Sequence, residues 1–215
     1  LKIERRDRSY PKMVTSFTAL FLIATLLLTF GGGASAAHRR WRLLESADER
    51  QALVNLYDST QDVRRKWTRF EGWATKTADH CGWYGVTCDD DGSVTRLILE
   101  NNGLRKILPD LSALTSLEYL DLRGNKIGGT LPDLGALTSL VALHLDENQF
   151  TGTLPDLGAL TSLTELYLEA NQFTGTLPDL GALTSLTRLD LEQNQIGVEG
   201  GKALAEALKV NGSVT

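Results

Sequence analysis

Leucines recur along the chain in a pattern that repeats every 23 residues. Each unit has the form LxxLxLxxN, in which leucines such as Leu120 and Leu122 alternate with residues that face the other way. This alternation predicts a short strand with one buried face. The same step separates Leu97, Leu120, Leu143, Leu166 and Leu189, then Leu99, Leu122, Leu145, Leu168 and Leu191, and then Pro109, Pro132, Pro155 and Pro178. One unit cannot bury these leucines alone, so the pattern predicts a solenoid of stacked units with a parallel sheet.

The other half of each unit contains the segment TLPDLGALTSL, which occurs unchanged from Thr130, Thr153 and Thr176. Its leucines are expected to return along the side opposite the strand in a short turn or 3₁₀ segment. The asparagines of the pattern form a column of their own: Asn102, Asn125, Asn148, Asn171 and Asn194. A carboxamide both donates and accepts hydrogen bonds, so at the inner bend it can pair with backbone groups of two adjacent coils. We therefore expect the column to be structural rather than a ladder that faces a ligand.

The pattern resembles the leucine-rich-repeat family, and specifically its plant-type class. That class has an LxGxIP element after the asparagine, and 127–132, 150–155 and 173–178 match it. The first unit departs from it, with Lys106 in place of the glycine, and the units are one residue shorter than is usual for the class. The resemblance covers about residues 46–196. It implies an α/β solenoid, a right-handed arc with a concave parallel β-sheet and a helical N-terminal cap.

The cap is expected before the first strand. The run Ser46-Ala47-Asp48-Glu49 has the form of a capping box, and apolar residues at helical spacing follow it. The stretch from Cys81 to Cys88 is similar to the CxWxGVxC element of plant-type caps. Three tryptophans, Trp67, Trp73 and Trp83, precede the first strand. Amphipathic rings of this kind are expected in the core of the cap, and the alternative is a binding platform.

The N-terminal part has the features of an export signal. An apolar run, Phe17–Phe30, is too short for a membrane span, and the small residues Ala34-Ser35-Ala36-Ala37 that follow suit signal peptidase. Met13 is the only methionine, so residues 1–12 would precede the true start. The alternative is an uncleaved signal anchor. Either way, the remaining chain is expected to be secreted or at the cell surface.

Export places the only two cysteines in an oxidising compartment, where a close pair usually forms a disulfide. We therefore expect a bond between Cys81 and Cys88. A metal site is the alternative, but it needs two further ligands and only His80 lies near. No metal and no cofactor are expected.

The last unit differs from the others. Residues 195–201 lead into 202–209, which predict a helix with Leu204 and Leu208 on its apolar stripe, and the whole stretch resembles the ribonuclease-inhibitor type of repeat. Asn211 begins an Asn-Gly-Ser glycosylation sequon. The expected division is therefore a signal peptide over 1–36, a cap over 37–93, four plant-type repeats over 94–185, a ribonuclease-inhibitor-type repeat over 186–213, and the start of a truncated repeat at 214–215.

Charge and missing motifs narrow the function. The net charge of −5 argues against nucleic acid as a partner. Phosphate-binding loops and kinase motifs are absent from the sequence, and His144 with Asp121 and Tyr167 has no activated serine or cysteine near it. We therefore predict no enzymatic activity in these residues. Membrane association is expected only through sequence beyond Thr215 or through an uncleaved anchor.

Outward residues of the concave strands are the candidate ligand site, because solenoids use that face and these residues vary between units. The candidates are Arg96, Tyr119, Asp121, Arg123, His144, Asp146, Glu165, Tyr167, Glu169, Arg188 and Asp190. Acidic residues predominate, which favours a protein or peptide ligand with a basic or mixed polar surface. The alternative is that these are solvated strand residues with no ligand.

The resemblance implies an extracellular recognition module, either secreted or receptor-like. One alternative is the ectodomain of a receptor kinase or another enzyme whose catalytic domain lies beyond Thr215, and the transcript past that residue would distinguish the two. A second alternative is an intracellular scaffold, suggested by the ribonuclease-inhibitor-type repeat. The export signal and the Cys81–Cys88 pair argue against the scaffold.

Overall fold

The computed structural model describes residues 48–62, 67–76 and 79–210, all within one compact unit, Arg42–Thr215. Four sequence predictions lie outside the described residues. They are the signal peptide, the Ser46 end of the capping box, the Asn211 sequon and the strand start at 214–215. Within the described residues, no helix has both the length and the apolar composition needed to cross a membrane.

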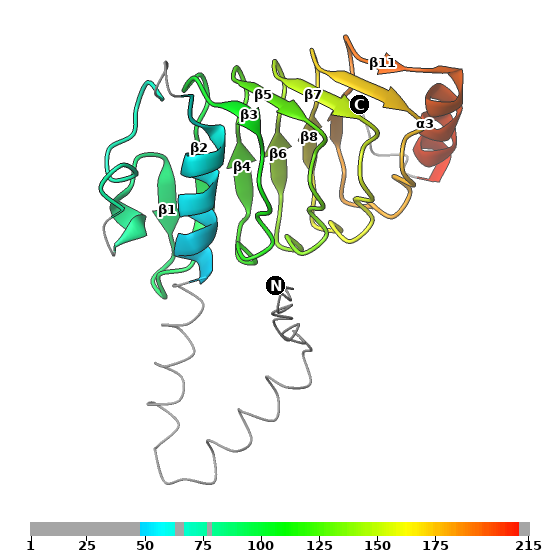
Figure 1. Ribbon diagram of the computed structural model, residues 1–215. Helices are drawn as coiled ribbons and strands as arrows, with labels where there is room; N and C mark the ends of the chain where they lie inside the picture. Colours follow the sequence, from blue (N-terminus) through cyan, green and yellow to red (C-terminus); the bar gives the residue numbers. More distant parts are fainter. Residues whose placement is uncertain (1–47, 63–66, 77–78, 211–215) are drawn as a thin grey trace, which may run out of the picture. The chain divides into compact units, whose positions relative to one another are not determined.

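A helix over 48–60 and a tryptophan core form the N-terminal cap, as the sequence predicts. Trp73 is fully buried, and its ring centroid lies 4.9 Å from that of Trp67 and 5.0 Å from that of Trp83. Because all three rings are at least 98% buried, they form the core of the cap and cannot be a binding platform. The helix lies beside the first coil of the solenoid (Figure 1), and the three rings belong to the same buried cluster as the leucines of that coil.

A short antiparallel pair joins the cap to the solenoid. It follows the 3₁₀ turn η1 (His80–Gly82) and consists of β1 (Val86–Cys88) and β2 (Val94–Ile98). The leucine pattern does not predict β1, because this strand belongs to the cap and lies outside the repeat. Glu49 of the helix is buried, and its carboxylate accepts a hydrogen bond from the N–H of Val94 at 3.2 Å. This bond ties the helix to the first strand of the repeat.

The predicted concave sheet is present and has six strands in the order β1-β2-β4-β6-β8-β10. Its repeat strands are β4 (Tyr119–Asp121), β6 (Ala142–His144), β8 (Glu165–Tyr167) and β10 (Arg188–Asp190), after β2. Each residue pairs with its equivalent 23 positions later, as in Leu120 with Leu143 and Leu143 with Leu166. Equivalent side chains therefore stand beside one another in columns along the sheet.

A second parallel sheet is present that the sequence analysis did not predict. Its five strands, in the order β11-β9-β7-β5-β3, lie on another side of the coils (Figure 1). They are β3 (Arg105–Ile107), β5 (Lys126–Gly129), β7 (Gln149–Gly152), β9 (Gln172–Gly175) and β11 (Gln195–Ile196). Each of the middle strands buries one side chain, for example Phe150, so the alternation is too short to be recognised. The 3₁₀-type turns that were predicted lie later, as in the bond from Leu137 N to Leu134 O.

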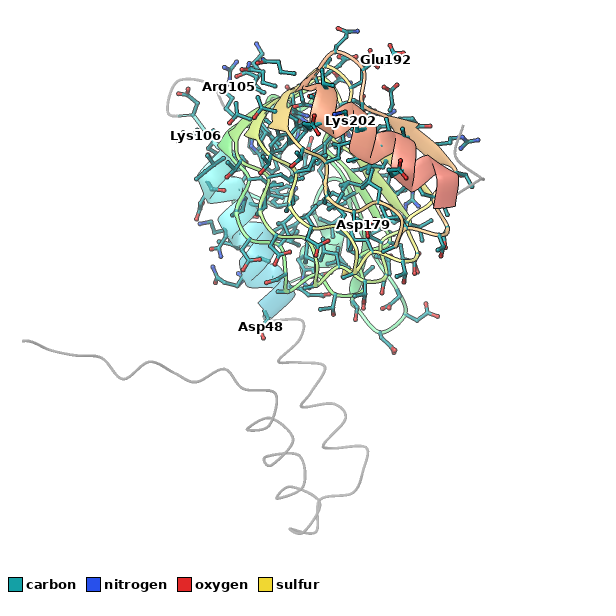
Figure 2. The ribbon with its side chains drawn as sticks, turned by 90° about the vertical axis from the view of Figure 1, so that its right-hand side faces the viewer. Asp48, Arg105, Lys106, Asp179, Glu192 and Lys202 are labelled. Atoms are coloured by element: carbon teal, nitrogen blue, oxygen red, sulfur yellow. A yellow bond between two sulfur atoms is a disulfide. The ribbon has the colours of Figure 1, made fainter. Side chains whose placement is uncertain are left out.

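The core is a column of leucines enclosed by the two sheets and the returning segments. Leu120, Leu122, Leu134 and Leu137 are fully buried, and the neighbouring coils repeat this set, whereas Leu189 and Leu191 of the last strand are only partly buried. At the C-terminal end the predicted helix is present as α3 (Val198–Val210), which lies across the end of the coils (Figure 2). The helix packs on the last coil through Ala203 and Leu204, which are partly buried against the core, while Val198 remains 77% exposed.

Candidate functional site

The outward side chains of the six-stranded sheet form three columns, which together we call the six-stranded face. The strand register places Arg96 beside Tyr119, Asp121 beside His144, and His144 beside Tyr167. The complete columns are Arg96, Tyr119, Ala142, Glu165 and Arg188; Ile98, Asp121, His144, Tyr167 and Asp190; and Glu100, Arg123, Asp146, Glu169 and Glu192. All the candidate ligand residues therefore lie on one face.

His144 is the centre of a polar network on this face. Its Nδ1 atom lies 3.1 Å from the hydroxyl of Tyr119, and its Nε2 atom lies 3.2 Å from a carboxylate oxygen of Glu165. The rings of Tyr119 and Tyr167 meet the imidazole edge-on, with centroids 5.1 and 4.8 Å away. The network extends at both ends, because the guanidinium of Arg96 lies 4.2 Å above the Tyr119 ring and Arg188 is paired with Glu165. Aromatic and charged side chains thus support one another across five coils.

A second network holds Asp121. Its carboxylate lies 2.8 Å from Nη2 of Arg123, and the Nε atom of that arginine donates to Glu100 at 3.0 Å. Although burial alone would lower the pKa of the Arg123 guanidinium, Asp121 and Glu100 raise it above its ordinary value. Arg123 is therefore fixed between two carboxylates, which limits how far it can reach toward a ligand.

Two candidate contact residues are much less accessible than their outward direction suggests. The side chain of Asp121 is 1% exposed and that of His144 is 6% exposed. Columns in a parallel sheet stand about 4.8 Å apart, so long neighbouring side chains cover short ones. Tyr119, Arg123 and Tyr167 lie above Asp121 and His144 in this way. The two buried groups therefore position the tyrosines and Arg123 rather than offering a surface of their own.

The C-terminal half of this face carries negative charge with little compensation. Burial raises the pKa of Asp146, and the nearby charge of Arg123 offsets that only in part. The pKa of Glu169 is also raised, first by loss of solvation and then by the charges of Asp190 and Glu192. A raised carboxylate pKa means that the environment disfavours the negative charge. A cation that bound there would relieve this repulsion.

Burial and the neighbouring Asp121 raise the pKa of the Tyr119 phenol above its ordinary value. The hydroxyl therefore stays protonated under physiological conditions and remains a hydrogen-bond donor. Neither tyrosine is positioned beside a serine or cysteine nucleophile on the described face. The arrangement has the chemistry of a binding surface, with aromatic rings, hydroxyls and carboxylates.

Cys81 and Cys88 in the cap are bonded to each other, with Cα atoms 5.6 Å apart. His80 is near, but the two sulfurs are not thiolates and so cannot ligate a metal. His80 is 98% buried, with Nε2 3.8 Å from a carboxylate oxygen of Glu49. The His80, Cys81 and Cys88 group is therefore a part of the cap framework.

The asparagine column faces inward and pairs with the backbone. Asn125 donates from Nδ2 to the carbonyls of Leu99 and Leu122 at 2.8 Å, and its Oδ1 accepts from the N–H of Leu104 at 3.0 Å. Asn102 begins the column by bonding the cap, since its Oδ1 accepts from the N–H of Arg69 at 2.6 Å. Each asparagine after the first therefore joins one coil to the next.

Models of known families match three parts of the chain. A leucine rich repeat N-terminal domain matches residues 46–89, which include the described helix and the disulfide. Leucine rich repeats match residues 116–137, 162–182 and 182–205. None of these models represents a catalytic domain. The assignment of the last unit to the ribonuclease-inhibitor type stays a prediction.

Curated relatives come from plants. Leucine-rich repeat protein 1 of Arabidopsis thaliana is 38% identical over 81 residues, which are 37% of this chain and 36% of that protein. The probable leucine-rich repeat receptor-like protein kinase At5g49770 of Arabidopsis thaliana is 36% identical over 72 residues, 32% of this chain and 7% of that kinase. The matched region is thus about a third of one relative and a small part of the other.

Three solved structures share the fold. The BIR2 ectodomain from Arabidopsis thaliana is 28% identical, with a TM-score of 0.63 over 69% of this chain and 81% of that one. A plant ice-binding protein is 28% identical, with a TM-score of 0.60 over 70% of this chain and 49% of that one. The ectodomain of the Arabidopsis thaliana receptor kinase GASSHO1/SCHENGEN3, in complex with CASPARIAN STRIP INTEGRITY FACTOR 2, is 29% identical. Its TM-score is 0.55 over 69% of this chain and 21% of that one. Together with the family models, these likenesses identify the chain as a leucine-rich-repeat protein with an N-terminal cap domain typical of plant extracellular proteins.

Proposed function

We propose that this chain is an extracellular recognition module that binds a protein or peptide on the six-stranded face. One observation carries the proposal: the outward residues of this face differ from coil to coil, whereas the returning segment TLPDLGALTSL is identical in three coils. A varied surface on a rigid frame can encode specificity. Solenoid proteins commonly bind their partners on such a face.

The charge of the face favours a partner with a basic or mixed polar surface. Asp146, Glu169, Asp190 and Glu192 lie at its C-terminal half, and loss of solvation raises the pKa values of Asp146 and Glu169, to which the charges of Asp190 and Glu192 add at Glu169. Lysine or arginine side chains of a partner would neutralise these carboxylates. Because none of these carboxylates is fully buried, salt can screen them and binding should weaken as salt rises.

Tyr119 and Tyr167 are the proposed anchors. Both are half-buried, and His144 holds them in place from between. Tyrosine is enriched at binding hot spots because it offers a large apolar ring and a polar tip at low entropic cost. In this proposal Asp121 and His144 have a supporting role, because their side chains are almost fully buried and a ligand would scarcely touch them.

The solved complex of the GASSHO1/SCHENGEN3 ectodomain with CASPARIAN STRIP INTEGRITY FACTOR 2 supports binding of this kind in a related ectodomain. The receptor-like relatives and the ectodomain structures also imply an extracellular or cell-surface location. Secretion through the signal peptide over 1–36 and a boundary of the cap near residue 93 remain part of the proposal.

The test selects binders from a displayed library of random peptides against the purified protein. We expect selected peptides to be enriched in lysine and arginine and the variant Tyr119→Ala/Tyr167→Ala to weaken their binding by about 2 kcal/mol or more, as for hot-spot tyrosines. The control is Thr138→Ala/Thr161→Ala, which changes two exposed residues of the returning segment. Folded tyrosine variants that bind as tightly as the control would show that the site lies elsewhere, with the cap as the next surface to test.

A second candidate function is ice binding. It is favoured by the likeness to a plant ice-binding protein together with one structural observation, the rows of uncharged threonine and glutamine side chains on the five-stranded sheet. The fold alone would not support it, because the same fold is shared with receptor ectodomains. Its test is whether the purified protein slows the recrystallisation of ice in a frozen sucrose solution.

A further inference from the structure

The five-stranded sheet presents an outer surface that differs sharply from the six-stranded face. Strands β5, β7 and β9 bury Ile127, Phe150 and Phe173, so the residues that alternate with these point outward. We call this outer surface the threonine face. Its outward positions, including the residue after each strand, are Lys126, Gly128, Thr130, Gln149, Thr151, Thr153, Gln172, Thr174, Thr176 and Gln195.

The register of the sheet arranges these residues in rows. Strands pair with an offset of 21 residues rather than 23, so that Thr151 lies beside Gln172 and Thr174 lies beside Gln195. Continued by one residue pair at each strand end, the same offset places Thr130 beside Thr151 and Thr153 beside Thr174. Two rows result, Thr130–Thr151–Gln172 and Thr153–Thr174–Gln195. The Thr-Gly-Thr spacing therefore yields neighbouring threonines in adjacent coils.

Glycines between the threonines allow them to pack closely. A Cβ atom added at Gly175 would lie 3.0 Å from the Thr153 methyl, and one added at Gly152 would lie 3.1 Å from the Thr130 methyl. Both glycines also have a positive φ, which side-chain-bearing residues rarely adopt. The methyl groups are thus seated on the backbone of the next coil. This contact restricts the threonine rotamers and keeps the hydroxyls in a repeated arrangement.

The chemistry of the threonine face excludes several kinds of ligand. Its outward residues from Gln149 to Gln195 include no ionisable group and no aromatic ring, although 23% of the whole chain is charged. Charge is confined to the first strands, where Lys126 and the labelled Arg105 and Lys106 lie (Figure 2). Without charges the face cannot form ion pairs with a charged partner, and without aromatic rings it cannot stack on sugar rings.

The repeated hydroxyls instead match a ligand that is uncharged and periodic. Each threonine hydroxyl donates one hydrogen bond and accepts two, as a water molecule in a lattice also donates and accepts. Neighbouring strands lie about 4.8 Å apart, and outward residues on one strand lie about 6.6 Å apart. A grid with these two spacings can hold ordered water in a pattern that continues into an ice lattice.

We infer that the threonine face, and in particular the two rows of threonines, is a site that adsorbs ice. The inference rests on the second proposed function and assigns it to named residues. It is independent of the six-stranded face, because the two sheets use different strands. The sequence pairs a varied surface on one sheet with a repeated one on the other.

The experiment measures the lowest protein concentration that arrests ice recrystallisation. For the variant Thr151→Lys/Thr174→Lys, which changes one threonine in each row, this concentration should rise at least about tenfold, which corresponds to 1.4 kcal/mol of lost adsorption. The matched control is Thr161→Lys/Thr184→Lys, which makes the same change at the same 23-residue spacing on exposed positions of the returning segment. Thermal melting confirms that both variants are folded, and Thr151→Val/Thr174→Val serves if the lysine variant does not fold.

The outcomes separate the two levels of the proposal. A wild-type protein without effect on ice would overturn the ice-binding function and the site together. A wild-type protein that arrests ice growth while the threonine-face variants remain as active as the control would overturn the site alone. Retention of the wild-type protein on insoluble cellulose, lost in the threonine-face variant, without any effect on ice would assign the face to a neutral glycan and overturn the inference.

Discussion

Replacing Asn148 by alanine tests whether the asparagine column carries the stacking of the coils. Asn148 is 7% exposed and donates from Nδ2 to the carbonyls of Leu122 and Leu145, at 2.9 and 3.1 Å. Its Oδ1 accepts from the N–H of Ile127 at 3.1 Å. A fourth bond goes from Nδ2 to the carbonyl of Asp146 at 3.2 Å, and that carbonyl also accepts from the N–H of Gly124. The four bonds link two consecutive coils, so the variant removes one complete link of the column.

The cost follows from which backbone groups lose every partner. The carbonyl of Leu122 still accepts from Asn125 at 2.8 Å, and that of Leu145 still accepts from Asn171 at 2.9 Å. Only the N–H of Ile127 is left without its acceptor. One buried unpaired donor costs about 1–3 kcal/mol, and we expect Asn148→Ala to lower the free energy of unfolding by that amount.

Urea denaturation followed by circular dichroism measures this difference. Gln149→Ala is the matched control, because the neighbouring side chain is exposed and its loss should change the free energy of unfolding by less than about 0.5 kcal/mol. Asn194→Ala should cost less than Asn148→Ala, since Asn194 is only half-buried and water can reach the groups it leaves. Equal urea midpoints for Asn148→Ala and wild type would refute the conclusion that the inward-facing asparagines stabilise the stacking of the coils.

Two further predictions concern a glycine and a carboxylate. Gly85→Ala should destabilise the fold by at least about 2 kcal/mol, because φ is +79° and the new Cβ would lie 2.2 Å from the carbonyl oxygen of Ile98. The control is Gly92→Ala, which has a φ of +84° but open space around the new Cβ, and it should cost less in the same melting assay. Equal losses of stability in the two variants would contradict a steric clash at Gly85. Asp146→Asn should increase the free energy of unfolding at pH 7 by less than about 1 kcal/mol, which is seen as a higher melting temperature. The reason is that burial raises the pKa of Asp146, so the folded protein binds the proton of this carboxyl more tightly than the unfolded chain does. The stability of the wild type falls as pH rises from the ordinary carboxyl pKa through the raised pKa of Asp146, so the advantage of Asp146→Asn should vanish near pH 3. As a control, Asp90→Asn changes an exposed carboxylate and should not increase stability at either pH.

The leucine spacing was sufficient to predict the five repeat strands of the six-stranded sheet and the inward column of asparagines. In each coil the two alternating leucines and the asparagine face inward while the residues between them face outward, so the sequence pattern alone indicates a strand with one buried face. The rings of Trp67, Trp73 and Trp83 were also expected in a core, because a small cap has few other large apolar groups. The helix α3 followed from apolar residues at helical spacing.

The five-stranded sheet could not be predicted in the same way. A strand such as Gln149–Gly152 buries only Phe150, and two of its four residues, Thr151 and Gly152, are small. Its hydrogen bonds come from the coil on either side, so the strand depends on stacking and has no strong local propensity. The burial of His144 was missed for a related reason, since it arises from Tyr119 and Glu165 of neighbouring coils, which are 25 and 21 residues away in sequence.

The two sheets use one repeat in different ways because their registers differ. In the six-stranded sheet the offset equals the repeat length, so each residue stands beside its own equivalent and a substitution changes one column. In the five-stranded sheet the offset is two residues shorter than the repeat. An outward residue such as Thr151 therefore stands beside Gln172, which lies two residues before Thr174, the equivalent of Thr151 in the next coil. A row of threonines there requires threonine at both positions of the coil, which the Thr-Gly-Thr triplets of β7 and β9 supply. Selection for such a row would therefore act on pairs of positions within a coil, and selection for a specific partner would act on single positions of the other sheet.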